Sequence, residues 1–169
     1  MPGSLQADDQ QADSVCVNAM PDLSVQQAAA WTGFMSTHAE IVRELDEGLA
    51  AHFGLSLSAL DVLARVASAP EGGVRMSDLG QRALLSQTRI SRVVGELQGR
   101  GLLERTSCPS DSRGVFAQIT DAGGELTRQA LQWRSDQIRE RFFTSLDERQ
   151  VAELATIWRA IGAGAEIGA

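Results

Sequence analysis

The chain has 169 residues, of which 43% are hydrophobic and 22% are charged, and its formal net charge is −7 at pH 7. This composition is typical of one globular domain and excludes a chain that is disordered throughout. No segment approaches 18 consecutive apolar residues and the first basic residue is Arg43, so we expect a cytoplasmic protein with neither a membrane span nor a secretory signal.

The charge is unevenly distributed along the chain. Residues 1–60 contain eight acidic side chains and one Arg, whereas residues 75–113 contain seven Arg and four acidic side chains. All 15 basic residues are Arg, whose planar fork suits bidentate recognition of phosphates and base edges. A polyanion responds to the local electrostatic field at the site of contact. The basic segment 75–113 is therefore compatible with binding to a nucleic acid, although the whole chain is acidic.

A long helix is predicted after an N-terminal tail. Residues 1–21 are polar, acidic and aperiodic, which indicates a disordered tail. Over residues 22–53, apolar residues and one His recur at steps of three and four, as on one face of a helix. These residues are Trp31, Phe34, Met35, His38, Val42, Leu45 and Leu49.

The segment FGLSLSALD interrupts that pattern and starts a second helix. Ser58 is the expected N-cap of this helix, with Asp61 as the return partner of a capping box. The helix carries Leu60, Leu63 and Val66 on its apolar face and ends at APEGG, where Pro and Gly stop it.

Two shorter helices, separated by the turn LLS, follow. Ser77 is expected to cap the first, which runs through Ala83, and Ser86 to cap the second, which runs from Gln87 to about residue 100. Gly101 suits the C′ position that ends the second helix. The apolar face of the second helix holds Ile90, Val93, Val94 and Leu97. Its other face holds Gln87, Thr88, Arg89, Ser91 and Arg92.

A β-hairpin is predicted next. LLERTSC and GVFAQIT have the composition of strands, and Pro109, Ser110, Asp111 and Gly114 supply turn residues between them. Asp111 and Gly114 are expected to shape the turn, and Arg113 to point outward beside Asp111. An Arg at a hairpin tip suits a narrow minor groove, where the negative potential is deepest. The alternative is a plain turn with an incidental surface ion pair.

Two helices are predicted after the hairpin. Thr120 is expected to cap the segment DAGGELTRQALQWRSDQIRERFF, and Ser145 and Glu148 are expected to form the capping box of a last helix. The apolar face of that last helix holds Val151, Leu154, Ile157, Trp158 and Ile161. Residues 164–169 are expected to form a flexible end.

The helix pair and the hairpin together predict a DNA-binding unit. The second helix of such a pair fits the major groove, where Arg pairs naturally with guanine and Gln with adenine. Its first amides and its N-terminal hydroxyls suit phosphates. The alternative for the helix alone is an ordinary surface helix with solvated arginines. The predicted DNA-binding residues are Ser77, Ser86, Gln87, Thr88, Arg89, Ser91, Arg92 and Arg113.

These segments resemble the MarR family of bacterial transcription regulators. The resemblance lies in LSLSALDVL, in MSDLGQRALLSQTRISRVVGELQGRGLLER and in DSRGVFAQITDAGG, which matches a wing pattern of D-x-R, an apolar strand and T-x-x-G. It implies a mainly α fold with a small β-hairpin wing, comprising a winged helix-turn-helix over residues 55–120 and a helical dimerisation region over residues 22–54 and 121–163. It also implies a homodimeric repressor that binds double-stranded DNA at a pseudo-palindromic operator and responds to a small molecule.

A narrower resemblance is to the urate-responsive branch of that family. The acidic extension, Trp31, Asp61 and the wing segment CPSDSRG carry it. It implies that Trp31 and Asp61 help to bind an effector such as a phenolic acid or a urate-like anion, and His38, on the same helix face as Trp31, is the third candidate. From the residues alone, Trp31 and His38 also suit a protein core, and Asp61 suits a helix cap.

The cysteines and histidines bear on the remaining alternatives for the function. Cys16 and Cys108 lie far apart and in no metal-ligand spacing, so they are expected to be free thiols. The sharper alternative is a redox-sensing regulator of the same fold.

His38 and His52 form no H-E-x-x-H pattern, and no catalytic or phosphate-loop motif is present. We therefore expect no enzyme, metal or cofactor; a helical adaptor that does not bind DNA is the other alternative.

Overall fold

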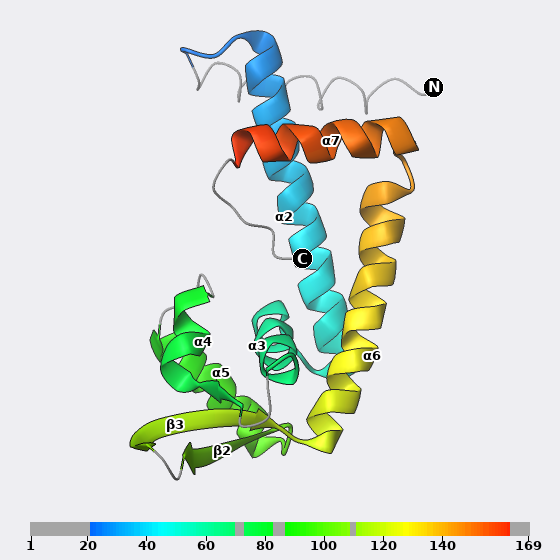
Figure 1. The fold of residues 1–169 in the computed structure, drawn as a ribbon. Coiled ribbons are helices and arrows are strands. Elements are labelled where there is room, and N and C mark those ends of the chain that lie inside the picture. Colours follow the sequence, from blue (N-terminus) through cyan, green and yellow to red (C-terminus); the bar gives the residue numbers. More distant parts are fainter. Residues whose placement is uncertain (1–20, 70–72, 83–86, 109–110, 163–169) are drawn as a thin grey trace. The chain divides into compact units, whose positions relative to one another are not determined.

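The computed structural model describes residues 21–69, 73–82, 87–108 and 111–162. The predicted mainly helical fold with a small hairpin is confirmed (Figure 1). In chain order the elements are α2 (Val25–Phe53), α3 (Leu57–Ala67), β1 (Val74–Arg75), α4 (Met76–Arg82), α5 (Gln87–Gly99), β2 (Leu103–Cys108), β3 (Asp111–Ile119), α6 (Asp121–Ile138), the π-helical segment η1 (Arg139–Phe143) and α7 (Glu148–Ile161).

The described residues divide into two compact units, the first up to Glu44 and the second from Leu45. In the first unit, α2 begins with reciprocal capping contacts. The N–H of Ser24 donates to Gln27 Oε1 at 2.8 Å, and the N–H of Gln27 donates to Ser24 Oγ at 3.2 Å. These bonds satisfy amides at the start of the helix, so α2 begins at Val25 and not at the predicted residue 22.

The apolar face predicted for this helix is exposed over much of the first unit. Trp31 is 52% exposed, and Phe34, Met35 and Val42 are also among the exposed large hydrophobic residues. The ring centroids of Trp31 and Phe34 lie 5.9 Å apart, and those of Phe34 and His38 lie 6.0 Å apart. A contiguous exposed apolar stripe is typical of a surface that another chain covers.

The second unit is built around one hydrophobic core. The largest fully buried side chains include those of Leu49, Leu55, Leu60, Leu63, Leu79, Ile90, Leu97 and Leu103. These residues come from the end of α2, from α3, α4 and α5, and from the loop and strand that adjoin them. Burial of one such side chain contributes about 1.5–3 kcal/mol, so this cluster fixes how α5 packs on the unit.

The start of α3 differs from the sequence prediction. Ser56, and not Ser58, is the N-cap, and its Oγ accepts the N–H of the third helical residue at 3.1 Å. The N–H of Leu57 donates to Oδ1 of Asp46 on α2 at 2.7 Å. The predicted capping box of Ser58 and Asp61 is therefore wrong, because the contact from α2 fixes the start of α3 two residues earlier.

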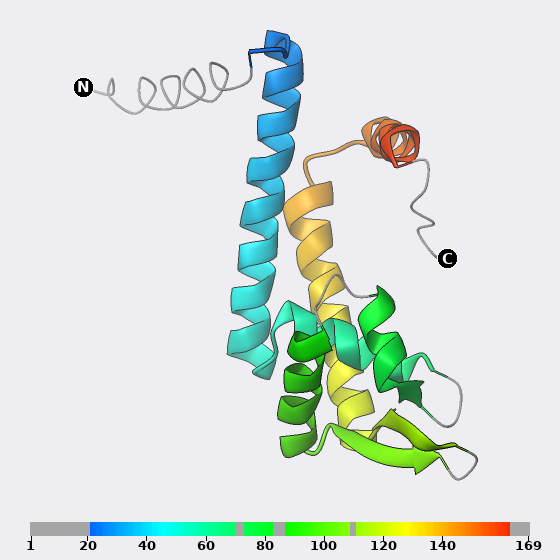
Figure 2. The ribbon, with the colours of Figure 1, turned by 90° about the vertical axis from the view of Figure 1, so that its left-hand side faces the viewer.

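The sheet has one more strand than the sequence predicted. Its order is β1-β3-β2, and both pairings are antiparallel. The residues of β1, Val74 and Arg75, face Ala117 and Phe116 of β3. Ala117 is fully buried, whereas the guanidinium of Arg75 lies over the ring of Phe116 at 5.2 Å from its centroid. Figure 2 shows the hairpin of β2 and β3 extending away from α6.

The end of α5 follows the prediction. Gly101 has a φ of +70°, a left-handed conformation that favours glycine. Its N–H donates to the carbonyl of Gln98 at 2.9 Å, and the N–H of Leu102 donates to the carbonyl of Leu97 at 3.0 Å. This is the Schellman arrangement, which satisfies the last carbonyls of a helix. The paired helix before α5, α4, is described from Met76 to Arg82, and its predicted end at Ala83 lies outside the described residues.

The start of α6 also follows the prediction. The Oγ1 of Thr120 accepts the N–H of Gly123 at 3.0 Å and donates to the carbonyl of Gly101 at 2.7 Å. A Cβ on Gly123 would collide with the carbonyl oxygen of Leu102. The T-x-x-G spacing therefore allows α6 to begin in close contact with the loop that ends α5.

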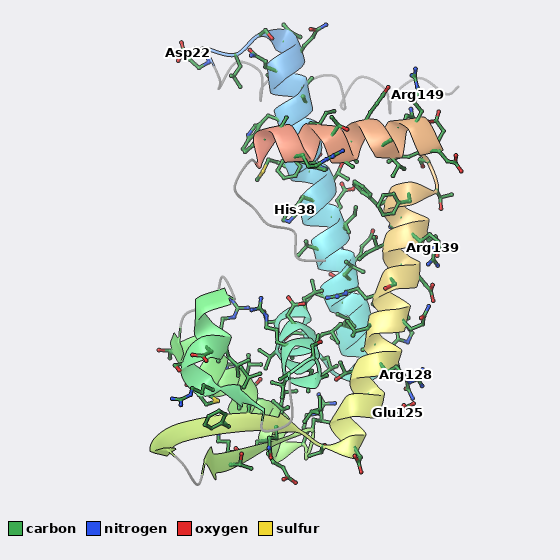
Figure 3. The ribbon with its side chains drawn as sticks, in the orientation of Figure 1. Asp22, His38, Glu125, Arg128, Arg139 and Arg149 are labelled. Atoms are coloured by element: carbon green, nitrogen blue, oxygen red, sulfur yellow. The ribbon has the colours of Figure 1, made fainter. Side chains whose placement is uncertain are left out.

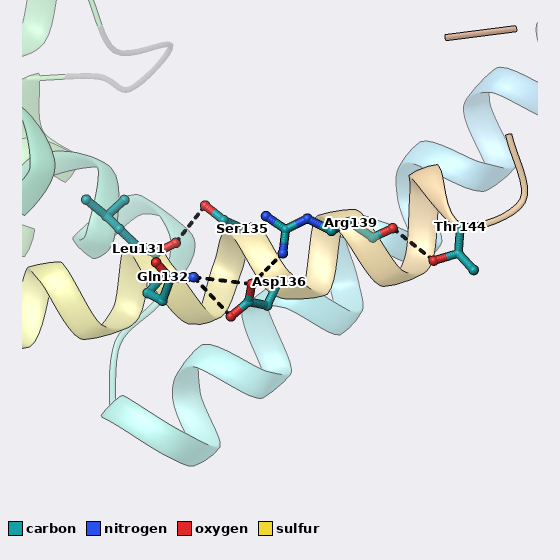
Figure 4. Close-up of polar contacts among 6 residues, drawn as sticks. All are labelled: Leu131, Gln132, Ser135, Asp136, Arg139 and Thr144. Carbon is teal, nitrogen blue, oxygen red and sulfur yellow. Dashed lines mark hydrogen bonds and ion pairs between the residues drawn. The ribbon is translucent and has the colours of Figure 1, made fainter. Parts of the chain in front are cut away.

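The long helix predicted after the hairpin is divided near its end. The carbonyl of Arg139 accepts the N–H of Thr144 at 3.1 Å. It also accepts the hydroxyl of Thr144 at 3.2 Å (Figure 4). The first of these bonds spans five residues, which is the spacing of a π-helix. As a result α6 ends at Ile138 and η1 continues to Phe143.

The cap of α7 is another correction. Asp147 Oδ1 accepts the N–H of Gln150 at 2.8 Å, and Gln150 Oε1 accepts the N–H of Asp147 at 2.9 Å. The predicted capping box of Ser145 and Glu148 is therefore wrong. Asp at the N-cap with Gln three residues on performs the same function two residues later.

None of the described helices is by itself long and apolar enough to cross a bilayer. Only α2 and α3 taken together, as a bent pair, pass that test of length and composition.

Candidate nucleic-acid interface

The two faces of α5 differ as the sequence predicted. Ile90, Val93, Val94 and Leu97 are buried in the core of the second unit. On the opposite side, Thr88, Arg89, Ser91 and Arg92 are exposed. The core therefore holds α5 by one face and presents its polar face to solvent. Ser86 and the side chain of Gln87 lie outside the described part of the structure.

Two of the predicted DNA-binding arginines have polar partners on the surface. Arg89 Nη2 lies 3.4 Å from Oγ of Ser58 on α3. Arg92 Nε donates to Glu96 Oε1 at 3.0 Å, one helical turn further on. Exposed pairs of this kind are each worth about 0–1 kcal/mol, so a phosphate or a base edge can compete for either guanidinium.

Ser77 is not the cap of α4. The helix begins at Met76, so Ser77 lies inside its first turn. Its side chain is exposed, and its hydroxyl donates to Asp78 Oδ1 at 3.0 Å. The predicted cap is wrong, while the assignment of Ser77 to DNA binding stays a prediction.

Sequence reasoning did not single out Arg105, which lies beside the exposed face of α5. Arg105 Nη2 donates to the backbone carbonyl of Ser91 at 3.5 Å from its position on β2. Arg105 was counted in the basic block, but only the pairing of strand and helix brings it next to the predicted DNA-binding residues. The high arginine content of residues 75–113 is the sequence signal that could have pointed to Arg105. The sequence alone could not show that Arg105 lies beside the exposed face of α5.

The hairpin carries the predicted wing residues. β2 ends at Cys108 and β3 begins at Asp111, whose Cα is the partner of the Cα of Cys108 after an irregularity in the pairing. Gly114 lies in β3 between Asp111 and Val115, where the pairing with β2 is irregular, and its predicted role in shaping the turn stays a prediction. The side chains of Asp111, Arg113 and Cys108 lie outside what the structure describes, and their roles remain predictions.

The three effector candidates are divided between the two units. Trp31 and His38 lie in the first unit and Asp61 lies in the second. Asp61 Oδ1 accepts a hydrogen bond from Nη1 of Arg134 on α6 at 2.9 Å, and the side chain of Arg134 is 27% exposed. The ion pair joins α3 to α6 and places a partly buried cation beside one of the predicted effector residues.

The carboxylates with the clearest pKa shifts lie on α6, away from α5. Hydrogen bonds from Arg128 and Gln129 lower the pKa of Glu125 from 4.5 to about 2, and the Glu125–Arg128 pair is visible on one side of α6 in Figure 3. Hydrogen bonds from Gln132 and Arg139 lower the pKa of Asp136 (Figure 4). Both carboxylates pair with side chains three or four positions away along the chain, an arrangement that stabilises a helix locally.

A groove of about 700 Å³ lies between α6, η1 and α7. It is lined by Ser135, Ile138, Arg139, Phe143, Leu146, Glu148, Val151, Ala152 and Ala155. No residue of η1 or α7 is buried, although α7 carries the predicted apolar face. Ile157 and Ile161 are 50% and 72% exposed.

The redox alternative predicted for the two cysteines stays a prediction. Cys16 lies outside the described residues, and of Cys108 only the backbone at the end of β2 is described. Among the described residues, no group of three or more His, Cys, Asp and Glu side chains is arranged to hold a metal ion.

Known proteins are similar to this chain in sequence and in fold. The sequence model of the MarR family matches residues 53–114. The uncharacterized HTH-type transcriptional regulator ML2140 of Mycobacterium leprae is 30% identical over 98 residues, which are 57% of this chain and 67% of the relative. Sco3205, a MarR family transcriptional regulator from Streptomyces coelicolor solved in complex with DNA, is 28% identical with a TM-score of 0.76 over 85% of this chain and 90% of its own. AbsC from the same organism is 27% identical with a TM-score of 0.73 over 83% and 95%.

Proposed function

This chain belongs to the MarR family of winged-helix transcriptional regulators, and we propose that it is a repressor that a small-molecule effector releases from its operator. The proposed active form is a homodimer on a pseudo-palindromic site, with half-sites about 10–11 base pairs apart. Residues 55–120 form the proposed DNA-binding domain, and residues 22–54 and 121–163 the proposed dimerisation region. We propose that it acts in the cytoplasm, where its target DNA lies.

The observation that carries the DNA-binding proposal is the division of α5. A helix that is held by Ile90, Val93 and Val94 presents a continuous row of Thr88, Arg89, Ser91 and Arg92 on its open side. Short hydroxyl side chains and arginines near the N-terminal end of a helix suit a major groove and its phosphates. Arg105 adds a further basic group on the same side.

The homodimer is supported by the apolar surfaces that the described chain leaves exposed. α7 has no buried residue, and its Ile157, Trp158 and Ile161 are exposed. The same helix contributes Val151, Ala152 and Ala155 to a groove that is lined mainly by apolar side chains. In the first unit, the stripe of Trp31 and Met35 is also exposed. Surfaces of this kind are energetically costly in a monomer and are typical of association sites.

The DNA-binding proposal is tested by anisotropy with an operator selected from random duplexes by the full-length protein. Arg89→Ala and Arg92→Ala should each weaken binding about 10- to 100-fold, because a bidentate Arg–guanine contact is worth roughly 1–3 kcal/mol. Arg149→Ala, which removes an exposed Arg paired with Glu153 on α7, is the matched control and should bind like the wild type.

A salt titration separates the regulator from the helical adaptor. Binding of the wild type should fall steeply with salt, because phosphate contacts release counterions. Unchanged binding in the Arg89→Ala/Arg92→Ala double variant, or a flat response to salt, would favour the adaptor.

The wing is proposed to contact the minor groove through Arg113, with Asp111 fixing its direction. Arg113→Ala should weaken binding with little change in the bases selected under α5, because the minor groove distinguishes few sequences. A strong change in preference at the bases contacted by α5 would contradict the wing assignment.

The effector is proposed to be a phenolic acid or a urate-like anion, bound with the help of Trp31, His38 and Asp61. The proposal is supported by the exposed ring of Trp31 and by the cation of Arg134 beside Asp61. Release of the operator complex should be measured with phenolic acids, with urate and with peroxide. Release by peroxide alone that disappears in Cys16→Ser or Cys108→Ser would replace the ligand proposal with a redox one.

A further inference from the structure

Two helices of the second unit end next to each other. α2 stops just before Gly54 and α5 just before Arg100 and Gly101, and the two glycines have left-handed backbones with φ of +62° and +70°. The residue after each glycine is buried, with Leu55 1% and Leu102 7% exposed. The core therefore holds both helix ends in fixed positions.

The guanidinium of Arg100 joins these two ends. Its Nη1 donates to the carbonyl of Gly54 at 2.6 Å, and its Nη2 donates to the carbonyl of Phe53 at 3.0 Å. The last carbonyls of a helix lack partners within the helix and lie at the negative end of its dipole. A planar cation with several donors suits two such carbonyls, whereas an ammonium group is a single point charge.

The end of α2 is in turn packed on α6. The indole of Trp133 lies so close over Gly48 that no Cβ would fit there. The ring centroid of Trp133 is 6.1 Å from that of Phe53 and 5.5 Å from that of His52. Arg100 therefore connects α5 to a frame of two packed helices and not to a loop.

Arg100 is at the opposite end of α5 from the residues assigned to base contacts. It follows Thr88 by 12 positions, which corresponds to about 18 Å along a helix axis. Its guanidinium is directed at the end of α2. Its position therefore suits a role in orienting α5 and not in contacting the bases.

We propose that Arg100 is a positioning residue that fixes the orientation of α5 on α2 and α6, and thereby selects the spacing between the two half-sites that a dimer accepts. The inference rests on the proposed function, because it requires a dimer on two half-sites. One added base pair changes both the distance and the angular position of a half-site. A recognition helix with a fixed orientation therefore discriminates between spacings, and a loosened one discriminates less.

The test is an operator series in which the selected site is shortened or lengthened by one and two base pairs. The wild type should prefer one spacing and lose roughly tenfold or more in affinity at its neighbours, as for a mismatch of about 1.4 kcal/mol. Arg100→Ala should bind the preferred spacing less tightly and show a flatter profile across the series. Arg100→Lys should give an intermediate profile, because it keeps the charge and loses the two-donor geometry.

Several controls make the result decisive. Arg92→Ala, which removes a proposed contact without affecting the helix ends, should lower affinity at every spacing and keep the profile of the wild type. The salt dependence of Arg100→Ala should match that of the wild type, because no phosphate contact is removed. If Arg100→Ala does not fold, the profile of Arg100→Lys decides the question.

Two results would overturn the inference. One is a profile for both Arg100 variants that keeps the shape of the wild-type profile. The other is a salt slope reduced by about one, which would make Arg100 a phosphate contact. A wild-type protein that binds none of the sites would instead refute the proposed function.

Discussion

α3 and α7 are both amphipathic helices, but they are in opposite situations. Five residues of α3 are buried, namely Ala59, Leu60, Val62, Leu63 and Val66. In α7, where apolar residues recur with similar spacing, no residue is buried. The comparison teaches that an apolar pattern shows which face of a helix must be covered, but not which chain covers it.

The difference follows from where the partner surfaces come from. α3 packs against α5, α6 and β3 of its own unit, so its burial is complete within one chain. α7 follows η1 and lines an open groove together with α6 and η1, and none of its residues is buried. We therefore expect that the packing of α3 limits the stability of the second unit. We expect that the packing of α7 limits the stability of the proposed dimer.

The largest effect is expected for Leu63→Ala in α3. The side chain of Leu63 is fully buried, and Leu→Ala in a core costs about 2–5 kcal/mol because of lost burial and the cavity left behind. Thermal or urea unfolding should show this loss.

Leu154→Ala in α7, tested at concentrations where the wild type is dimeric, should weaken the dimer more than it destabilises the DNA-binding unit. If Leu63→Ala and Leu154→Ala lowered the unfolding stability of the monomer equally, the proposed difference between α3 and α7 would be wrong.

A large effect on assembly is expected for Ile157→Glu. A charge at the centre of the proposed α7 interface should raise the dimer dissociation constant by roughly 30-fold or more, as expected for a residue worth about 2 kcal/mol. Light scattering across a dilution series measures it. Thr156→Glu adds the same charge to the adjacent, polar side of α7 and should leave the dimer intact. Dissociation in both variants, or in neither, would contradict the assignment of the interface.

A moderate effect is expected at the start of α3. Ser56→Ala should destabilise the protein by about 1 kcal/mol, because it removes the N-cap. Ser58→Ala should cost less, about 0.5 kcal/mol, because the half-buried Ser58 caps no helix and its hydroxyl has only a long contact with Arg89 at 3.4 Å. Urea unfolding of the two variants sharpens the picture of α3 as a helix that is fixed within its own chain. A larger loss for Ser58→Ala would support the capping predicted from the sequence.

The smallest effect is expected for the exposed pair of Glu125 and Arg128. Because the pKa of Glu125 is lowered to about 2 in the folded protein from an ordinary 4.5, its contribution is present above pH 4.5 and is lost as the pH falls towards 2. Glu125→Gln should therefore lower stability slightly at pH 7 and leave it unchanged near pH 2. Arg128→Gln should have the same effect. Thermal unfolding between pH 2 and pH 7 checks this, and an unaltered pH dependence in both variants would contradict it.

Much of the fold was predictable because its signals are local. The order of the helices, the hairpin, the end of α5 at Gly101 and the cap of α6 at Thr120 follow from periodicity and from the conformational preferences of single residues. The division of α5 into an apolar and a polar face, on which the proposed DNA contact rests, was predictable for the same reason.

The features that sequence reasoning missed depend on contacts between distant residues. β1 has two residues and exists through pairing with β3, more than 40 positions later, which no periodicity can indicate. Arg105 becomes part of the candidate interface through its contact with Ser91. The hydrogen bonds of Arg100 to the carbonyls of Gly54 and Phe53 likewise join residues that are 46 and 47 positions apart.

The start of α3 shows the division most clearly. By itself the sequence predicted a serine cap and an apolar face at Leu60 and Leu63, but it placed the cap at Ser58. Ser56 and Ser58 are both residues that suit a cap, so local preference did not identify Ser56. The tertiary structure decided for Ser56, because the carboxylate of Asp46 on α2 receives the N–H of Leu57. Local preferences limit the choices within a few residues, and contacts across the fold select among them.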